Sequence, residues 1–175
     1  TNQFHGSVFG RYQNQDLVGT DVNGLKSADF KVLQYGGTLG GAIIQDKLQY
    51  FFAVDRQERT APFDGITLEE SGAAPGDAER MIDHLNTLGA DQWGGAGSAG
   101  GFTIENPHPT YFGKLTWAPA ANHNVALSYN NVGASVDVLS RRQNGDWQLT
   151  SGAYCIENQT NSLRLSWNAV FGGKY

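Results

Sequence analysis

The stretch LQYGGTLGGAIIQDKLQYFFAVDRQ, residues 33–57, decides the fold. Apolar and polar side chains alternate along both of its halves. In the second half one face carries Leu48, Tyr50, Phe52 and Val54, and the other carries Lys47, Gln49, Asp55 and Gln57. A period of two residues is typical of a β-strand with one apolar and one polar face. The polar segment 45–47 is short enough for a tight turn, so the stretch predicts an antiparallel hairpin.

The same alternation recurs on both sides of this hairpin. We predict strands over residues 3–14, 33–44, 47–57, 110–117, 124–130 and 162–171. The second and fourth strands are followed by short polar turns, whereas the first, third and fifth are followed by long polar segments. Outer-membrane β-barrels have short periplasmic turns and longer extracellular loops, and the predicted connections follow this asymmetry.

Composition supports a membrane barrel over an ordinary globular domain. Charged residues make up 17% of the chain, against about 25% in typical globular proteins. A membrane-spanning helix needs about 20 consecutive apolar residues, and the longest apolar run is Tyr50–Val54. Lipid-facing and lumen-facing residues alternate along barrel strands, which keeps the mean hydropathy at −0.40. The net charge of −5 disfavours a nucleic-acid partner, because phosphate contacts need clustered basic residues.

We therefore predict an all-β fold, an antiparallel up-and-down transmembrane β-barrel segment of about six strands. Residues 1–175 are expected to be part of one barrel domain. Six strands cannot close as a membrane barrel, since the smallest examples have about eight, and unpaired strand edges are costly in lipid. The chain is thus expected to be a fragment of a longer protein. An alternative fold is a soluble, secreted β-sandwich binding module whose core consists of the same apolar faces.

The segment 58–108 is predicted to be one long extracellular loop that contains a short helix. Gly76 or Asp77 could cap this helix, and Gly89 would end it. Its apolar residues recur at helical spacing, at Met81, Ile82, Leu85 and Leu88.

Two groups of aromatic residues are candidate functional positions. Amphipathic rings favour membrane interfaces, and the rings expected there are Tyr12, Tyr50, Tyr111, Trp117, Tyr129 and Phe171. Trp93 and Trp147 lie in polar or glycine-flanked loop segments. We take them as candidate substrate contacts, and the alternative is that they pack within their loops.

The sequence motifs that could indicate catalysis, a cofactor or a metal lack the flanking elements or the spacing that these functions need. Residues 95–100 match a dinucleotide-binding glycine pattern, but no strand precedes them and no helix follows. The four histidines lack metal-ligand spacing, and the single cysteine, Cys155, cannot form an internal disulfide. We expect a protein that is not an enzyme and holds no cofactor or metal.

Several segments resemble, in order along the chain, the first barrel strands of Oar-like TonB-dependent receptors. These segments are residues 1–14, 35–48, 50–54, 112–117 and 161–167. The resemblance implies a large barrel of about 22 strands with a plugged lumen in the outer membrane of a Gram-negative bacterium. It also implies energised uptake of an unidentified substrate, with the plug domain and the TonB-contacting segment before Thr1. The alternative is a passive outer-membrane porin or an adhesin barrel.

Overall fold

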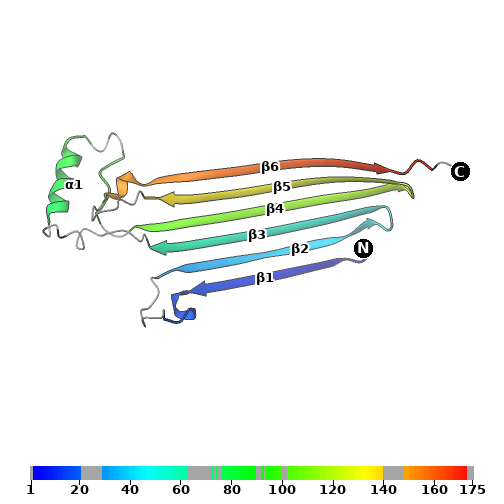
Figure 1. Ribbon diagram of the computed structural model, residues 1–175, viewed down its shortest axis with the longest axis horizontal. Helices are drawn as coiled ribbons and strands as arrows, with labels where there is room; N and C mark the ends of the chain where they lie inside the picture. Colours follow the sequence, from blue (N-terminus) through cyan, green and yellow to red (C-terminus); the bar gives the residue numbers. More distant parts are fainter. Residues whose placement is uncertain are drawn as a thin grey trace.

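The computed structural model describes residues 2–20, 29–62, 72, 74, 76–89, 92, 94–99, 102–139 and 148–172. Within these residues, six antiparallel strands form one sheet in chain order, β1 to β6 (Figure 1). Their bounds are His5–Asn14, Lys31–Ile44, Leu48–Pro62, Thr103–Ala120, His123–Val138 and Tyr154–Ala169. This up-and-down sheet, which does not close on itself, confirms the predicted fold class.

The strands extend further than the alternation predicted. Residues 58–62 and 103–108 were expected in a loop, yet Glu58 pairs with Pro107 and Pro62 pairs with Thr103. Proline is tolerated on strand edges, where its missing N–H is not needed. Here that condition holds for Pro107 and Pro109, because the pairing of β4 with β5 begins only at Thr110. The loop between β3 and β4 is therefore shorter than predicted.

The last two strands are also longer than predicted, since β5 continues to Val138 and β6 begins at Tyr154. The extension pairs Asn131 with Asn161 and Ser135 with Glu157, so the face that is apolar in the middle of the sheet becomes polar there. The opposite face of β5 instead carries Val132, Ala134, Val136 and Val138. The apolar side chains therefore change faces beyond Tyr129, and an alternation followed along one apolar face ends at that point. The sequence pattern for this reason detects only part of each strand.

The two short turns lie at one end of the sheet, and the longer connections lie at the other (Figure 1). In the β2–β3 turn, Asp46 adopts a left-handed conformation with φ 60°, and the Lys47 N–H donates to the Ile44 carbonyl over 3.1 Å. Asn2 fastens this turn, because its amide nitrogen donates to the Asp46 carboxylate over 2.6 Å and its amide oxygen accepts from the Asp46 N–H over 2.9 Å. The predicted asymmetry of the connections is confirmed.

The predicted helix is present as α1, Asp77–Thr87. Gly76 occupies the N-cap position with φ 84°, and Asp77 begins the helix, where a carboxylate is favoured by the helix dipole. Gly89 follows the helix with φ 91°, a conformation that glycine adopts without strain. Two 3₁₀ turns, η1 (Gln15–Leu17) and η3 (Thr150–Gly152), flank the strands at the same end. Among the described residues, no helix is long and apolar enough to cross a membrane.

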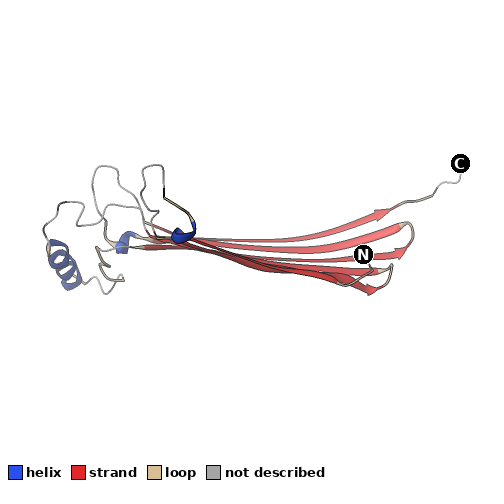
Figure 2. Ribbon diagram, turned by 90° about the horizontal axis from the view of Figure 1, so that it is seen from below, coloured by secondary structure: helices blue, strands red, loops and turns tan. Residues whose placement is uncertain are grey.

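The sheet has no buried core among the described residues. The hydrophobic residues that are buried there are Ala78, Ala96 and Leu139, and none of them belongs to a strand. Figure 2 shows the sheet as one curved layer with no second layer on either face. A β-sandwich needs two packed sheets, so the sandwich alternative does not fit the described strands.

Candidate membrane wall and lumenal face

Strand register assigns every paired residue to one of two faces, because directly opposed residues point to the same side of a sheet. One face, which we call the outer face, is apolar along the middle of the strands. Its apolar side chains are Val8, Tyr12, Leu33, Tyr35, Leu39, Tyr50, Phe52, Val54, Tyr111, Leu115, Trp117, Val125, Leu127, Tyr129, Leu163, Leu165 and Trp167. The sheet therefore carries a continuous apolar band on this face.

This band is too exposed for a water-soluble protein. Val8 is 91% exposed, Leu163 is 74% exposed and Leu165 is 70% exposed. Soluble proteins rarely expose contiguous apolar patches beyond a few hundred Å². In a bilayer the hydrocarbon chains cover such a surface, and the backbone groups are satisfied within the sheet. The outer face thus has the properties of a lipid-facing barrel wall.

The edge of the apolar band crosses the strands obliquely. On β1 the last apolar residue toward the long loops is Tyr12, and the strand pairings align it through β2 with Glu58 of β3. On β6 the last such residue is Leu163, and the pairings align it through β5 and β4 with Phe52 of β3. The edge therefore shifts by six residues over five strand spacings. With about 3.3 Å per residue and about 4.8 Å between strands, this shift corresponds to a tilt of roughly 40°. Membrane barrels have strand tilts of about 35–45°.

The aromatic residues predicted for the membrane interface come together on this face. Tyr12, Tyr111 and Tyr129 lie at the end of the band nearer the long loops, and Trp117 lies near the short turns. Phe171 follows β6, with its ring centroid 6.4 Å from that of Trp167 and 5.8 Å from that of His123. Tyr50 also lies on the outer face, opposite Gly41 and Leu115. Their role as an interfacial girdle remains our prediction.

The sequence analysis missed other outer-face aromatic residues. Tyr35 is 44% exposed and Trp167 is 63% exposed, and both are on the same face as the predicted set. Their alternation with polar neighbours was the available signal. The Tyr129 hydroxyl donates to the Asn161 amide oxygen over 2.7 Å, where the band gives way to polar residues.

The opposite face, which we call the lumenal face, is lined mainly by Ser, Thr, Asn, Gln and Gly. The Ser7 and Thr38 hydroxyl oxygens are 2.8 Å apart, and the Gln34 amide donates to the Asp55 carboxylate over 2.9 Å. Within the described strands, Asp55 is the one carboxylate on this face, and the cations are Arg11, Arg59, Lys114 and Arg164. This face is electropositive, although the whole chain has a net charge of −5.

Comparison with known proteins agrees with this geometry. A family model described as "Outer membrane beta barrel domain" matches residues 1–160. The chain belongs to this family. It is also 27% identical, over 201 aligned residues, to the TonB-dependent transporter Oar of Myxococcus xanthus. That alignment covers 99% of this chain and 18% of the relative, so the chain spans under one fifth of the length of the relative. No solved structure is a significant match.

Membership in the outer-membrane barrel family fixes the location of the chain. It lies in the outer membrane of a Gram-negative bacterium, with the apolar band in the bilayer. Outer-membrane barrels have short turns on the periplasmic side and longer loops outside the cell. This rule places α1 outside the cell and the turns at 45–47 and 121–122 in the periplasm (Figure 1).

The extracellular loops of this outer-membrane barrel are joined to one another. The Thr150 N–H donates to the Ser98 carbonyl over 2.8 Å, and the Ser98 N–H donates to the Thr150 hydroxyl over 2.7 Å. The Asn86 side chain of α1 accepts from the Ala96 N–H over 3.2 Å. These bonds connect α1, the segment 94–99 and η3. Trp93 and Trp147, the predicted substrate contacts, lie outside the described residues.

The described residues offer no evident catalytic or metal centre. No group of three or more His, Cys, Asp or Glu side chains among them could hold a metal ion. Cys155 is an exposed free thiol on β6, eight positions beyond Leu163 and outside the apolar band. Partial desolvation, followed by a hydrogen bond to Asp137 and the charges of Asp137 and Glu157, raises the pKa of this thiol above its usual range.

Cys155 gives a test of orientation and of this electrostatic effect. We expect a membrane-impermeant maleimide to label Cys155 of the full-length protein on intact cells, because β6 extends beyond the bilayer there. Thiolate is the reactive species. Asp137→Asn removes a negative charge that disfavours thiolate, so the pKa should fall and labelling at pH 7.5 should become several-fold faster.

The control for this experiment is Glu58→Gln, which removes an outer-face carboxylate three strands away from Cys155 and should leave the labelling rate unchanged. Labelling only after the outer membrane is permeabilised would contradict the assigned orientation. An unchanged rate in Asp137→Asn would contradict the electrostatic effect alone.

Proposed function

We propose that the chain is one part of the wall of an outer-membrane transporter that takes up its substrate with energy supplied through TonB. The single observation that supports this proposal most is the two-faced sheet, which has a bare apolar outer face and a polar lumenal face. The similarity to the TonB-dependent transporter Oar favours energised transport over other barrel functions. In this proposal the role is not enzymatic, and the chain works only as part of a complete barrel.

The other parts of the transporter, which are the further strands, the plug domain and the TonB-contacting segment, are also proposals. A barrel that closes needs more strands than the six described, because unpaired edges are not tolerated in lipid. We propose that other parts of the polypeptide supply those strands, a plug domain inside the lumen and the segment that contacts TonB. The partners are then outer-membrane lipid, the TonB system and an extracellular ligand whose identity is open.

The extracellular loops are proposed to form the entrance. The hydrogen bonds of Ser98 with Thr150 hold together the described segments that adjoin Trp93 and Trp147 in sequence. We therefore keep both tryptophans as proposed substrate contacts, since aromatic rings suit sugars and peptides. Loops held by a rigid scaffold commonly carry binding residues.

Uptake by matched strains tests the proposed function. Strains with the wild-type gene, without this gene and without TonB would be supplied with a panel of iron complexes, oligosaccharides and peptides. We expect at least one solute whose uptake falls about tenfold or more in both deletion strains. A receptor in which a two-residue Asn-Gly turn replaces residues 63–102 keeps the paired strand ends and should show the same loss, because the entrance is removed while the wall remains.

The outcomes separate the alternatives. Uptake that depends on this gene but not on TonB would establish a passive porin and contradict energised transport. Cell attachment that depends on this gene, without any dependent uptake, would establish an adhesin. Unchanged uptake after deletion of residues 63–102 would contradict a role for that loop and leave the barrel assignment standing.

A further inference from the structure

Three phenylalanines of the described strands, Phe9, Phe51 and Phe112, lie on the lumenal face, where a membrane barrel is normally polar. Phe9 packs over Gly36, and the other two form a pair. Phe51 of β3 and Phe112 of β4 have ring centroids 6.1 Å apart and planes inclined at 59°. Phe51 aligns with Lys114, and Phe112 aligns with Ala53, which places both rings on the face opposite the lipid. Neither ring contributes to the apolar band, so the membrane does not account for them.

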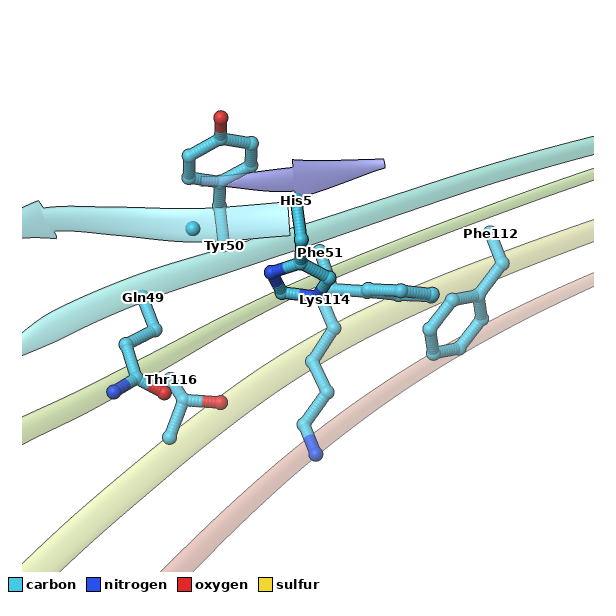
Figure 3. A pocket seen from close by; sticks show the side chains of 8 residues that line it. His5, Gln49, Tyr50, Phe51, Phe112, Lys114 and Thr116 are labelled. Atoms are coloured by element: carbon cyan, nitrogen blue, oxygen red, sulfur yellow. The ribbon is translucent and has the colours of Figure 1, made fainter. Parts of the chain in front are cut away.

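These rings line an open pocket of about 520 Å³. Small-molecule sites commonly measure about 300–1,000 Å³ and combine aromatic walls with a few polar groups. Figure 3 shows Phe51 and Phe112 on the same side of the sheet as His5, Gln49, Lys114 and Thr116, whereas Tyr50 points to the other side. The pocket therefore offers an apolar wall beside a cation and several hydrogen-bonding groups.

Glycine at position 40 leaves room for this pocket. A Cβ atom at Gly40 would lie 3.0 Å from the His5 ring and 3.2 Å from the Phe51 ring. Both rings thus rest against the bare backbone of β2. The His5 Nδ1 is 3.1 Å from the Gln3 carbonyl oxygen, which orients its ring at this position.

The positive charges near the pocket favour an anionic ligand. One register line runs through Phe51, Lys114, Ser128 and Arg164, so the two cations flank a serine on the neighbouring strand. Their Cα atoms are two strand spacings apart, about 9.5 Å, a span that two long basic side chains can close around an anion. Among the described residues, no carboxylate is within ion-pair distance of Lys114 or Arg164.

We propose that this lumenal pocket binds an amphipathic anion, a molecule with an aromatic or apolar body that carries a carboxylate or phosphate. The body packs against Phe51 and Phe112, and the anionic group binds Lys114 with Arg164 nearby. Thr116 and Gln49 supply hydrogen bonds at the rim. The inference rests on the proposed function in one respect, because transport would bring the ligand into the lumen.

The test uses the full-length protein purified in detergent and 2-naphthoate as the probe. Isothermal titration should detect binding of 2-naphthoate and little binding of 2-naphthylmethanol, which has the same rings without the charge. Lys114→Gln should raise the Kd of 2-naphthoate about tenfold or more, since a charge-assisted hydrogen bond is lost. Phe112→Ala should weaken binding through the lost ring contact while keeping the charge.

Arg11→Gln is the matched control. It removes one lumenal cation just as Lys114→Gln does, but Arg11 does not line the pocket. An unchanged Kd in Arg11→Gln supports a specific site. Three results would overturn the proposal: an equal loss of affinity in both variants, equal affinity for 2-naphthylmethanol and 2-naphthoate, or no binding of 2-naphthoate.

The two proposals can fail separately. If 2-naphthoate binds in the pocket but no uptake depends on TonB, the pocket stands and energised transport is wrong. If uptake depends on TonB but 2-naphthoate does not bind, the transporter stands and the pocket proposal is wrong.

Discussion

Leu127→Arg in the full-length protein is expected to cost about 2–4 kcal/mol of folding free energy, because it places a charge near the bilayer midplane. Leu127 lies on the outer face of β5, which pairs with a strand on each side, between Val125 and Tyr129. Its side chain is exposed within the sheet and would contact lipid in the membrane. The measurement is urea-induced unfolding in lipid vesicles, followed by tryptophan fluorescence.

The control for this variant is the adjacent residue in sequence. Ala126 faces the lumen, where it aligns with Thr116 and Ser166. Ala126→Arg adds the same side chain on the water-facing side and should change the unfolding free energy by less than about 1 kcal/mol, because lumenal substitutions avoid the lipid penalty. Comparable losses for both variants, or a larger loss for Ala126→Arg, would contradict the assignment of the two faces.

Gly36→Ala is expected to destabilise the sheet by about 1–3 kcal/mol, the usual range for overpacking. A Cβ atom at Gly36 would overlap the backbone carbonyl oxygen of Val54 and lie 2.8 Å from the tip of the Phe9 ring. The backbone of β3 cannot yield without disturbing the β2–β3 pairing. The same unfolding measurement applies, together with the amount of heat-modifiable barrel recovered from outer membranes.

The matched control is Gly10→Ala on β1. A Cβ atom at Gly10 would have nothing within 4 Å, and Gly10 aligns with Tyr35 on the outer face. This variant should be neutral or slightly stabilising, since alanine restricts the unfolded chain more than glycine does. If Gly36→Ala were as stable as Gly10→Ala, the close approach between β2 and β3 would be wrong.

The sequence prediction of the strands is accurate inside the bilayer and misses the strand segments that extend beyond it. Inside the bilayer the outer residues must be apolar and the lumenal residues polar, so alternation located every strand. Beyond Val54 on β3 and Tyr129 on β5 the outer face becomes polar, as at Glu58 and Asn131, so the rule that apolar side chains mark the outer face no longer applies. The strand extensions 58–62, 103–109, 131–138 and 154–161 were missed for this reason.

The candidate binding site depended on contacts that alternation cannot provide. Phe51 and Phe112 could be placed on the polar sides of their own strands from sequence, but their ring contact requires the β3–β4 register. Lys114 and Arg164 are 50 residues apart in sequence and meet only because Ser128 pairs with both. The helix over residues 77–87 could be predicted from the sequence, because its flanking glycines and its apolar spacing are local features of the chain.

The sequence by itself determined that this chain is a two-faced, six-stranded wall of a membrane barrel, because period-two alternation and loop lengths are local properties of the chain. Only the tertiary structure decided the strand register, the oblique edge of the apolar band and the pocket that contains Lys114. A shift of one residue in any pairing would move every side chain of that strand to the other face. Register arises from hydrogen bonding between segments far apart in the chain, so it cannot be read from any one segment.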